Sequence, residues 1–315
     1  MSRRRLVVGT RGSALALAQT EAVVTALREH HPDLTVEVRT ITTQGDRRRD
    51  LPLTAFSGRG AFVRAIQTAL LDGEVALAVH SLKDLPTAPV PGLTLAATPR
   101  RANPHDVLVT RPGVTLASLP LESRVGTGSL RRQAQLLAWR PDLRVVGIRG
   151  NVDTRLRKLT EGEVDALVLA AAGLIRLGRW SDTVWPLPVE IMLPAVGQGA
   201  LALEVRADDA EAQALVAPLN HAPTWAAVTA ERAFLRTLGG GCQVPVAAYG
   251  RLEAGELLLD GLVASPDGQK RLCSRIQGHP DEAESLGRRL AERLLSLGAQ
   301  CLLEAPVTVR EEGGP

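Results

Sequence analysis

Two stretches of the chain repeat one pattern, a short apolar strand followed by a glycine-rich turn and a helix. In the first, residues 6–9 lead into a turn that ends at Ser13, a residue suited to cap the following helix. In the second, residue Val125 leads into Gly126-Thr127-Gly128-Ser129 and another helix. A strand, tight turn, helix and further strand form a βαβ unit, which predicts a mostly parallel sheet. The repeat therefore predicts two similar α/β domains with a cleft between them.

A third domain follows these two. The length of 315 residues allows two or three domains, and the apolar fraction of 45% is enough for their cores. After residue 220 a long helix precedes three strand-like runs at 246–251, 257–263 and 271–276, and an amphipathic helix closes the pattern. We therefore expect a small α+β C-terminal domain with an antiparallel three-stranded sheet.

The sequence carries no sign of export or membrane insertion. No apolar run is long enough to span a bilayer, and the N-terminus lacks the apolar segment of a signal peptide. The three cysteines, Cys242, Cys273 and Cys301, show neither a paired framework nor a metal-binding spacing. These features predict a cytoplasmic protein without a membrane partner or a metal site.

The basic residues are almost all arginines. Of 37 basic residues only Lys83, Lys158 and Lys270 are lysines. Codon bias explains a bulk excess of arginine, but it does not explain arginines beside glycines. Arginine binds carboxylate or phosphate through two parallel hydrogen bonds. If the loop arginines near predicted strand ends face one cleft, its ligand is rich in such groups; they are Arg11, Arg131, Arg132, Arg149, Arg155 and Arg176.

Two further stretches carry reactive side chains. His80-Ser81-Leu82-Lys83-Asp84 follows a buried apolar strand, and ligands of open α/β sheets bind beyond the carboxyl ends of strands. Cys242 follows three glycines and precedes Pro245, which favours an exposed thiol, although a buried structural cysteine is the alternative. A thiolate is a strong nucleophile. An acid and a thiol beside an anion-binding cleft suggest covalent tethering of an acidic substrate.

Residues 43–60 are polar and have few apolar anchors. This composition predicts a mobile surface loop, which is a candidate lid. The glycine-rich turns match neither the phosphate-binding P-loop nor the dinucleotide-binding pattern.

Six motifs occur together in one order. They are Gly9-Thr10-Arg11-Gly12-Ser13, residues 79–86, residues 126–132, Arg149-Gly150-Asn151, residues 193–199 and Gly241-Cys242-Gln243-Val244-Pro245. With these motifs, nearly the whole chain resembles the porphobilinogen deaminase family, also called hydroxymethylbilane synthases.

The resemblance implies a fold and a reaction. The two α/β domains would be periplasmic-binding-protein-like, of type II, with bounds at 1–99 plus 200–217 and at 105–193, and the third domain would span 222–315. Cys242 would hold a dipyrromethane cofactor through a thioether. The enzyme would condense four porphobilinogen molecules head to tail onto this primer with loss of ammonia, and would release a linear tetrapyrrole for porphyrin and heme biosynthesis. A monomer is also implied.

The resemblance further implies roles for individual residues. Asp84 would be the main catalytic group, stabilising the positive charge that develops as ammonia leaves. The carboxylates of cofactor and substrate would be held by Arg11, Ser13, Ser81, Lys83, Thr127, Ser129, Arg131, Arg132, Arg149, Gly150, Arg155, Arg176 and Gln198. His80 is expected to be structural, and Cys273 and Cys301 receive no role. The chain departs from many relatives at Ala55, where they carry lysine, and at Gly128, where they often carry serine; Arg59 is a candidate replacement for the lysine.

Two other functions compete with this one. A non-catalytic carboxylate-binding protein would use the same two-domain cleft, but it would not need Cys242. A nucleic-acid binder is suggested by Arg3-Arg4-Arg5 and Arg47-Arg48-Arg49, yet these runs lack interleaved aromatic residues. We therefore expect no nucleic-acid partner.

Overall fold

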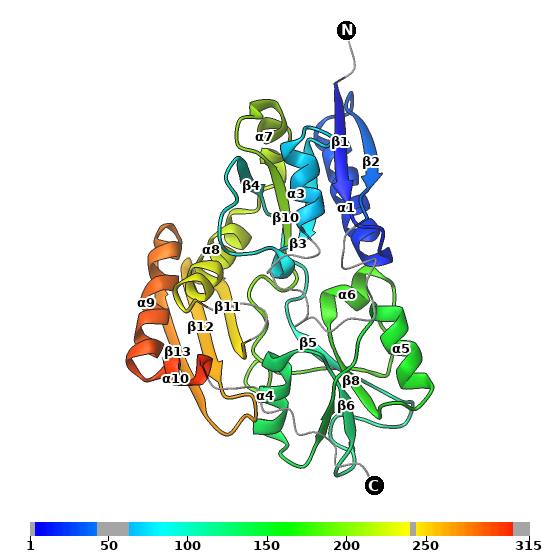
Figure 1. Ribbon diagram of the computed structural model, residues 1–315, viewed down its shortest axis with the longest axis vertical. Coiled ribbons are helices and arrows are strands. Elements are labelled where there is room, and N and C mark those ends of the chain that lie inside the picture. Colours follow the sequence, from blue (N-terminus) through cyan, green and yellow to red (C-terminus); the bar gives the residue numbers. More distant parts are fainter. Residues whose placement is uncertain (1–3, 43–62, 240–243, 305–315) are drawn as a thin grey trace.

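Figure 1 shows the computed structural model, which describes residues 4–42, 63–239 and 244–304. Two lobes, each built on a five-stranded sheet, lie one above the other, and a three-stranded sheet lies beside them (Figure 1). We call these units domains 1, 2 and 3. The predicted fold class, with two similar α/β domains and an α+β domain, is confirmed.

Domain 1 has the strand order β2-β1-β3-β10-β4. Its strands are β1 (Arg5–Thr10), β2 (Thr35–Thr40), β3 (Leu77–Ser81), β4 (Leu93–Ala97) and β10 (Leu201–Arg206). Its helices are α1 (Ala14–His30), α3 (Arg64–Leu71) and α7 (Ala210–Val216), with the short 3-10 turns η2 (Leu82–Asp84) and η3 (Ala217–Leu219). Apolar side chains of β1, β3 and β10 pack with those of α1 and α7 in one core.

Domain 2 repeats this layout with the order β7-β6-β8-β5-β9. Its strands are β5 (Asp106–Thr110), β6 (Arg124–Gly126), β7 (Arg144–Val146), β8 (Ala166–Ala170) and β9 (Val184–Pro186). Its helices are α4 (Leu130–Trp139), α5 (Val152–Thr160) and α6 (Ala171–Arg176). The sequence pattern did not predict β9, α6 or α7.

One strand in each sheet runs against the others. In domain 1, β10 is antiparallel to both β3 and β4, while β1 is parallel to β2 and β3. In domain 2, β5 is antiparallel to both β8 and β9. Each of these strands arrives directly from the other domain, because the chain crosses through residues 98–105 and returns through 187–200. The two crossing segments touch where the N–H of Ala102 donates to the carbonyl of Gly199 at 3.2 Å.

Domain 3 contains α8 (Ala222–Thr237), β11 (Val246–Glu253), β12 (Glu256–Ala264), β13 (Arg271–Gly278), η4 (Pro280–Glu282), α9 (Ala283–Ser296) and α10 (Ala299–Leu303). Its strands pair antiparallel in chain order, as predicted. Phe234 of α8 is fully buried in the core that α8 and α9 form with the sheet. Within the three described ranges, no helix has the length and apolar character needed to cross a membrane.

Candidate active site

A cavity of about 2770 Å³ lies between the domains. Fourteen of the predicted site residues fall in the described part of the chain, and all of them line it. They are Arg11, Ser13, Ser81, Lys83, Asp84, Thr127, Ser129, Arg131, Arg132, Arg149, Gly150, Arg155, Arg176 and Gln198. The structure therefore brings together residues that are far apart in the sequence.

Domain 1 contributes two turns at the carboxyl ends of neighbouring strands. Ser13 follows β1 and caps α1, its hydroxyl accepting the N–H of Ala16 at 3.3 Å. Ser81 ends β3 and exchanges hydrogen bonds with the side-chain amide of Gln19, at 2.9 and 3.1 Å. Lys83 and Asp84 lie in η2 directly after β3, and Asp84 is exposed to the cavity. Gln19 also lines the cavity and was not singled out from the sequence.

Domain 2 contributes the first turns of α4 and α5. Ser129 is the cap of α4, and its N–H donates to the Thr127 hydroxyl at 3.2 Å. Arg155 on α5 donates through Nε to the carbonyl of Gly150 at 2.9 Å. Of the six arginines grouped as loop arginines, Arg131, Arg132 and Arg176 lie on helices instead, and Arg155 lies on the helix that follows Asn151. Helix α6, which begins immediately after β8, places Arg176 at the cleft.

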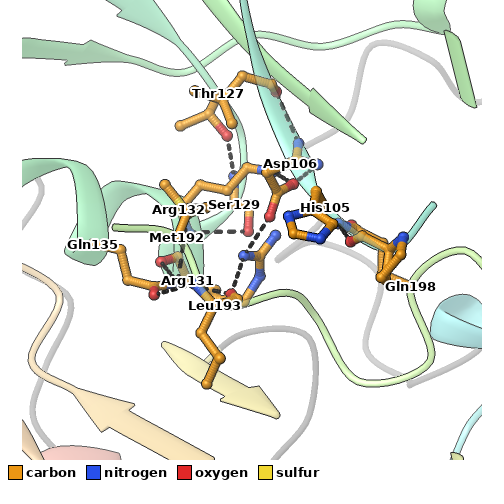
Figure 2. Close-up of polar contacts among 12 residues, drawn as sticks. His105, Asp106, Thr127, Ser129, Arg131, Arg132, Gln135, Met192, Leu193 and Gln198 are labelled. Carbon is orange, nitrogen blue, oxygen red and sulfur yellow. Dashed lines mark hydrogen bonds and ion pairs between the residues drawn. The ribbon is translucent and has the colours of Figure 1, made fainter. Parts of the chain in front are cut away.

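A buried carboxylate holds Arg131 and Arg132 from behind (Figure 2). Asp106 is fully buried at the start of β5, and its two oxygens each lie 2.7 Å from one guanidinium, Oδ2 from Arg131 and Oδ1 from Arg132. Arg132 also donates to the carbonyl of Val168, and Arg131 to that of Leu193. The two helical arginines are thus fixed in position and face the cavity as a pair.

Sequence reasoning missed Asp106. A charged residue at the start of the otherwise apolar run Asp106-Val107-Leu108-Val109 was the available signal. Its partners follow more than twenty residues later in the chain, so the pairing itself depends on the sheet. Burial raises the pKa of Asp106, but Arg131 and Arg132 outweigh burial and hold that pKa well below its usual range. Asp106 therefore stays ionised at neutral pH.

Burial lowers the pKa of three further cations of the cavity, Lys83, Arg155 and Arg176. Desolvation lowers the pKa of Lys83 to about 8, with Asp84 opposing this effect and Arg132 adding to it. Desolvation also lowers the pKa of Arg155 to about 10 and lowers the pKa of Arg176. Among the described residues no carboxylate pairs with Arg155 or Arg176, whose hydrogen bonds go to the carbonyls of Gly150 and Gly199. Charged donors without acidic partners fit an anionic ligand.

Gln198 lies where the two crossing segments meet domain 1. Its side chain is buried, donates to the carbonyl of Pro104 at 2.7 Å and accepts from Lys83 Nζ at 3.5 Å. The Gln198 backbone carbonyl accepts from Arg101 Nε at 2.8 Å. Gln198 therefore lies within a dense set of hydrogen bonds at the connection between the domains.

Cys242, Ala55, Arg59 and the whole loop at 43–60 lie outside the described residues. The described residues around the cysteine segment are nevertheless informative. Leu235, before the segment, and Val244 and Val246, after it, all line the cavity. His80 faces away from the cavity and lies 3.2 Å from Glu204 Oε2 within the domain 1 sheet.

Comparison with known proteins decides the family. Residues 6–214 match the family described as "Porphobilinogen deaminase, dipyromethane cofactor binding domain", and residues 225–296 match "Porphobilinogen deaminase, C-terminal domain". The chain belongs to the porphobilinogen deaminase family. It is 52% identical to the porphobilinogen deaminase of Roseiflexus sp. (strain RS-1) over 302 residues, covering 96% of this chain and 99% of the relative. It is also 52% identical to that of Desulforudis audaxviator (strain MP104C), covering 94% and 96%.

Among solved structures, the deaminase chain is similar to the methionine binding protein MetQ. The TM-score is 0.44 at 13% identity, covering 69% of this chain and 90% of MetQ.

The family fixes the activity. The chain is a transferase, a hydroxymethylbilane synthase that condenses four porphobilinogen molecules stepwise on a dipyrromethane cofactor, releases ammonia and yields a linear tetrapyrrole for porphyrin and heme biosynthesis. The family supports this enzyme and not the alternative of a non-catalytic carboxylate-binding protein. The donors of the cavity fit the cofactor, because each of its two pyrrole rings carries an acetate and a propionate, and Arg155 and Arg176 pair with no described carboxylate.

Proposed function

We propose that the cavity is the site of porphobilinogen condensation, that Asp84 is its catalytic carboxylate and that Cys242 holds the dipyrromethane through a thioether. One shared cavity is the main support for this proposal. It is lined by Asp84 from domain 1, by the arginines of domain 2 and by residues of domain 3 on both sides of 240–243. A covalent group anchored in that segment would have its carboxylates beside the arginines and a reacting end beside Asp84.

The proposed binding residues would hold the carboxylates of cofactor and substrate through charged side chains that their neighbours keep in a fixed orientation. Arg131 and Arg132, held by Asp106, and Arg155, held by Gly150, would bind acetate and propionate groups. Arg149 and Gly150 at the start of α5, Arg176 on α6, and Thr127 and Ser129 before α4 would complete the domain 2 side. On the domain 1 side we assign the same role to Arg11, Ser13, Ser81 and Lys83, and to Gln198 between them.

Asp84 would act on the substrate directly. Its carboxylate would accept the pyrrole N–H of porphobilinogen and stabilise the positive charge that develops as ammonia leaves. The same carboxylate would carry the proton lost in each addition. When bound, the dipyrromethane supplies the free pyrrole carbon to which the first substrate unit is added.

Intact mass tests the tether. We expect wild-type protein from a pyrrole-producing host to carry an excess equal to two linked pyrrole units, and Cys242→Ser to carry none. Cys273→Ser is the matched control, because Cys273 is an exposed free cysteine and should leave the excess in place. Unmodified wild-type protein that forms no tetrapyrrole from porphobilinogen would contradict the proposal.

The role of Asp84 has its own test. Asp84→Asn should retain the cofactor mass but lose about 100-fold or more in kcat, because the charge opposite the developing cation is removed. Full activity in that variant would exclude Asp84 as the catalytic carboxylate.

We also propose a cytoplasmic monomer without nucleic-acid or membrane partners, and domain bounds at 1–99 plus 200–217, 105–193 and 222–315. Each of the three ranges contains the strands of one sheet. Light scattering would test the monomer, and chromatography on immobilised DNA would test the absence of a nucleic-acid partner. A mass larger than that of one chain, or binding to the DNA that added salt abolishes, would contradict this part of the proposal.

A further inference from the structure

The turn that carries Asp84 is held by an arginine of domain 3 to which neither the sequence motifs nor the mechanism above assigns a role. Arg232 on α8 donates through Nη1 to the carbonyl of Leu85 at 3.2 Å and through Nη2 to the carbonyl of Pro86 at 2.8 Å. These two carbonyls follow Asp84 directly in the chain. Both hydrogen bonds therefore restrict the backbone at the carboxyl end of η2.

The same face of α8 fixes the other side chains of the turn. Val228, one helical turn before Arg232, is buried in a cluster that contains Leu82 and Leu85. Leu82 and Leu85 flank the pair Lys83-Asp84, so both neighbours of the polar pair lie in the apolar cluster that Val228 of α8 joins, while Asp84 remains exposed to the cavity. Domain 3 thus contacts the Asp84 turn through one apolar and one charged residue.

The charge of Arg232 has no carboxylate partner in the described parts of the chain. Desolvation lowers its pKa to about 10, Arg236 adds to this effect, and Glu204 opposes it. A partly buried guanidinium without an ion pair is costly, and its hydrogen bonds then compensate for lost water. Both described hydrogen bonds of the Arg232 guanidinium go to the Asp84 turn.

Helix α8 also leads to the cofactor segment. It ends at Thr237, and Leu238 and Gly239 separate it from residues 240–243. Leu235 on this helix lines the same cavity as Asp84. The same helix therefore contacts the Asp84 turn near its middle and ends five positions before Cys242 in the sequence.

We propose that Arg232 is a positioning residue that holds Asp84 at a fixed place relative to α8, and thereby relative to the cofactor attached at Cys242. This inference rests on the proposed roles of Asp84 and Cys242. The planar fork of arginine reaches two carbonyls at once, which a lysine ammonium at the end of a flexible stem does not do with the same geometry. The fork, rather than the charge alone, is therefore the feature that matters.

Three variants of the holoenzyme test the inference. Arg232→Lys keeps the charge and loses the fork, Arg232→Met loses both, and Arg236→Lys is the control, one turn along the helix, where the arginine pairs with the exposed Glu284. Intact mass first establishes that each carries the cofactor. We expect kcat to fall about tenfold in both Arg232 variants, from the loss of one or two hydrogen bonds to the turn, with KM changed by less than about twofold. The control should match the wild type.

Amide hydrogen exchange gives a second, structural readout. Peptides covering residues 80–90 should exchange faster in Arg232→Lys than in Arg236→Lys, while peptides from domain 2 should not differ. A wild-type kcat in Arg232→Lys, or unchanged exchange in this segment, would overturn the inference. A fall in kcat that is matched by loss of cofactor or of thermal stability would also overturn it, because the arginine would then be merely structural.

The inference and the proposed function fail in different ways. An active Asp84→Asn would remove the catalytic role of Asp84, whatever the Arg232 variants do. An inactive Asp84→Asn together with a fully active Arg232→Lys would leave the catalytic role in place and remove only the positioning role.

Discussion

Glu231 of α8 and Arg101 of the first crossing segment form a bidentate ion pair, with Nη1–Oε1 at 2.6 Å and Nη2–Oε2 at 3.2 Å. Glu231 is fully buried, and its carboxylate also accepts the N–H groups of Gly197 and Gly250 at 2.6 and 2.8 Å. Gly197 belongs to the second crossing segment and Gly250 to β11. One carboxylate therefore joins domain 3 to both connections between domains 1 and 2.

We expect Glu231→Gln to lower the free energy of unfolding by about 3–5 kcal/mol, because it leaves the buried charge of Arg101 without a counterion. Urea denaturation measures this change. Glu161→Gln is the control, since it removes an exposed ion pair with Arg157 and should change stability little. Equal stability of the two variants would show that the buried pair contributes no more than a surface pair.

Asp106→Asn should reduce cofactor loading. The substitution removes the negative charge that holds the Arg131 and Arg132 side chains in place. We therefore expect a smaller fraction of the protein to carry the mass of two pyrrole units. We also expect the free energy of unfolding to fall by about 3 kcal/mol or more. Asp165→Asn is the matched control, because Asp165 also pairs with two arginines of domain 2, Arg111 and Arg124, but at the surface. Full loading and wild-type stability of Asp106→Asn would contradict this expectation.

The pH dependence of kcat/KM should reflect Lys83. Its pKa is lowered to about 8, so the ammonium loses its proton as the pH rises through 8, and the attraction for substrate carboxylates is lost with it. We expect kcat/KM to fall above pH 8 in the wild type. In Lys83→Arg the side chain stays protonated, and this fall should move to higher pH. An identical profile in both proteins would assign the titration to another group.

Gly199→Ala should destabilise the contact between the crossing segments. Gly199 has a φ of +87°, and a Cβ there would lie 2.6 Å from the carbonyl oxygen of Ala102. Gly162→Ala separates the two causes, because Gly162 has a φ of +78° but no atom within 4 Å of the added Cβ. We expect Gly162→Ala to cost about 1–2 kcal/mol from backbone strain alone, and Gly199→Ala clearly more. Thermal denaturation of both variants measures the difference. Equal losses of stability would show that the contact between the added Cβ and the Ala102 carbonyl oxygen costs nothing.

The sequence predicts the elements of this protein better than their contacts. Local patterns were enough for the duplicated α/β units and the antiparallel third sheet, because hydrophobic periodicity and caps such as Ser13 and Ser129 act over a few residues. The six sequence motifs were enough to predict the family. The direction of β5 and β10 was not predictable in this way, since an apolar strand of five or six residues looks the same in either direction.

The residues that position the site were harder to predict. Three such contacts are those of Asp106 with its arginines, of Gln19 with Ser81 and of Arg232 with the Asp84 turn. The tertiary fold brings the partners of each contact together. Each of these contacts joins residues separated by more than twenty positions, so no local pattern marks them. Arg131 and Arg132 lie in the first turn of a helix rather than in a loop because the helix begins directly after its cap at Ser129.

The return of the chain to domain 1 as β10 sets an order on folding during synthesis. When the ribosome has made residue 97, the first sheet still lacks β10, which belongs between β3 and β4. Domain 2 needs no such late addition, because all its strands lie between Asp106 and Pro186. We therefore expect domain 2 to be the first complete sheet on the nascent chain, with the Asp84 turn reaching its final surroundings only after residue 206 and then α8 have emerged.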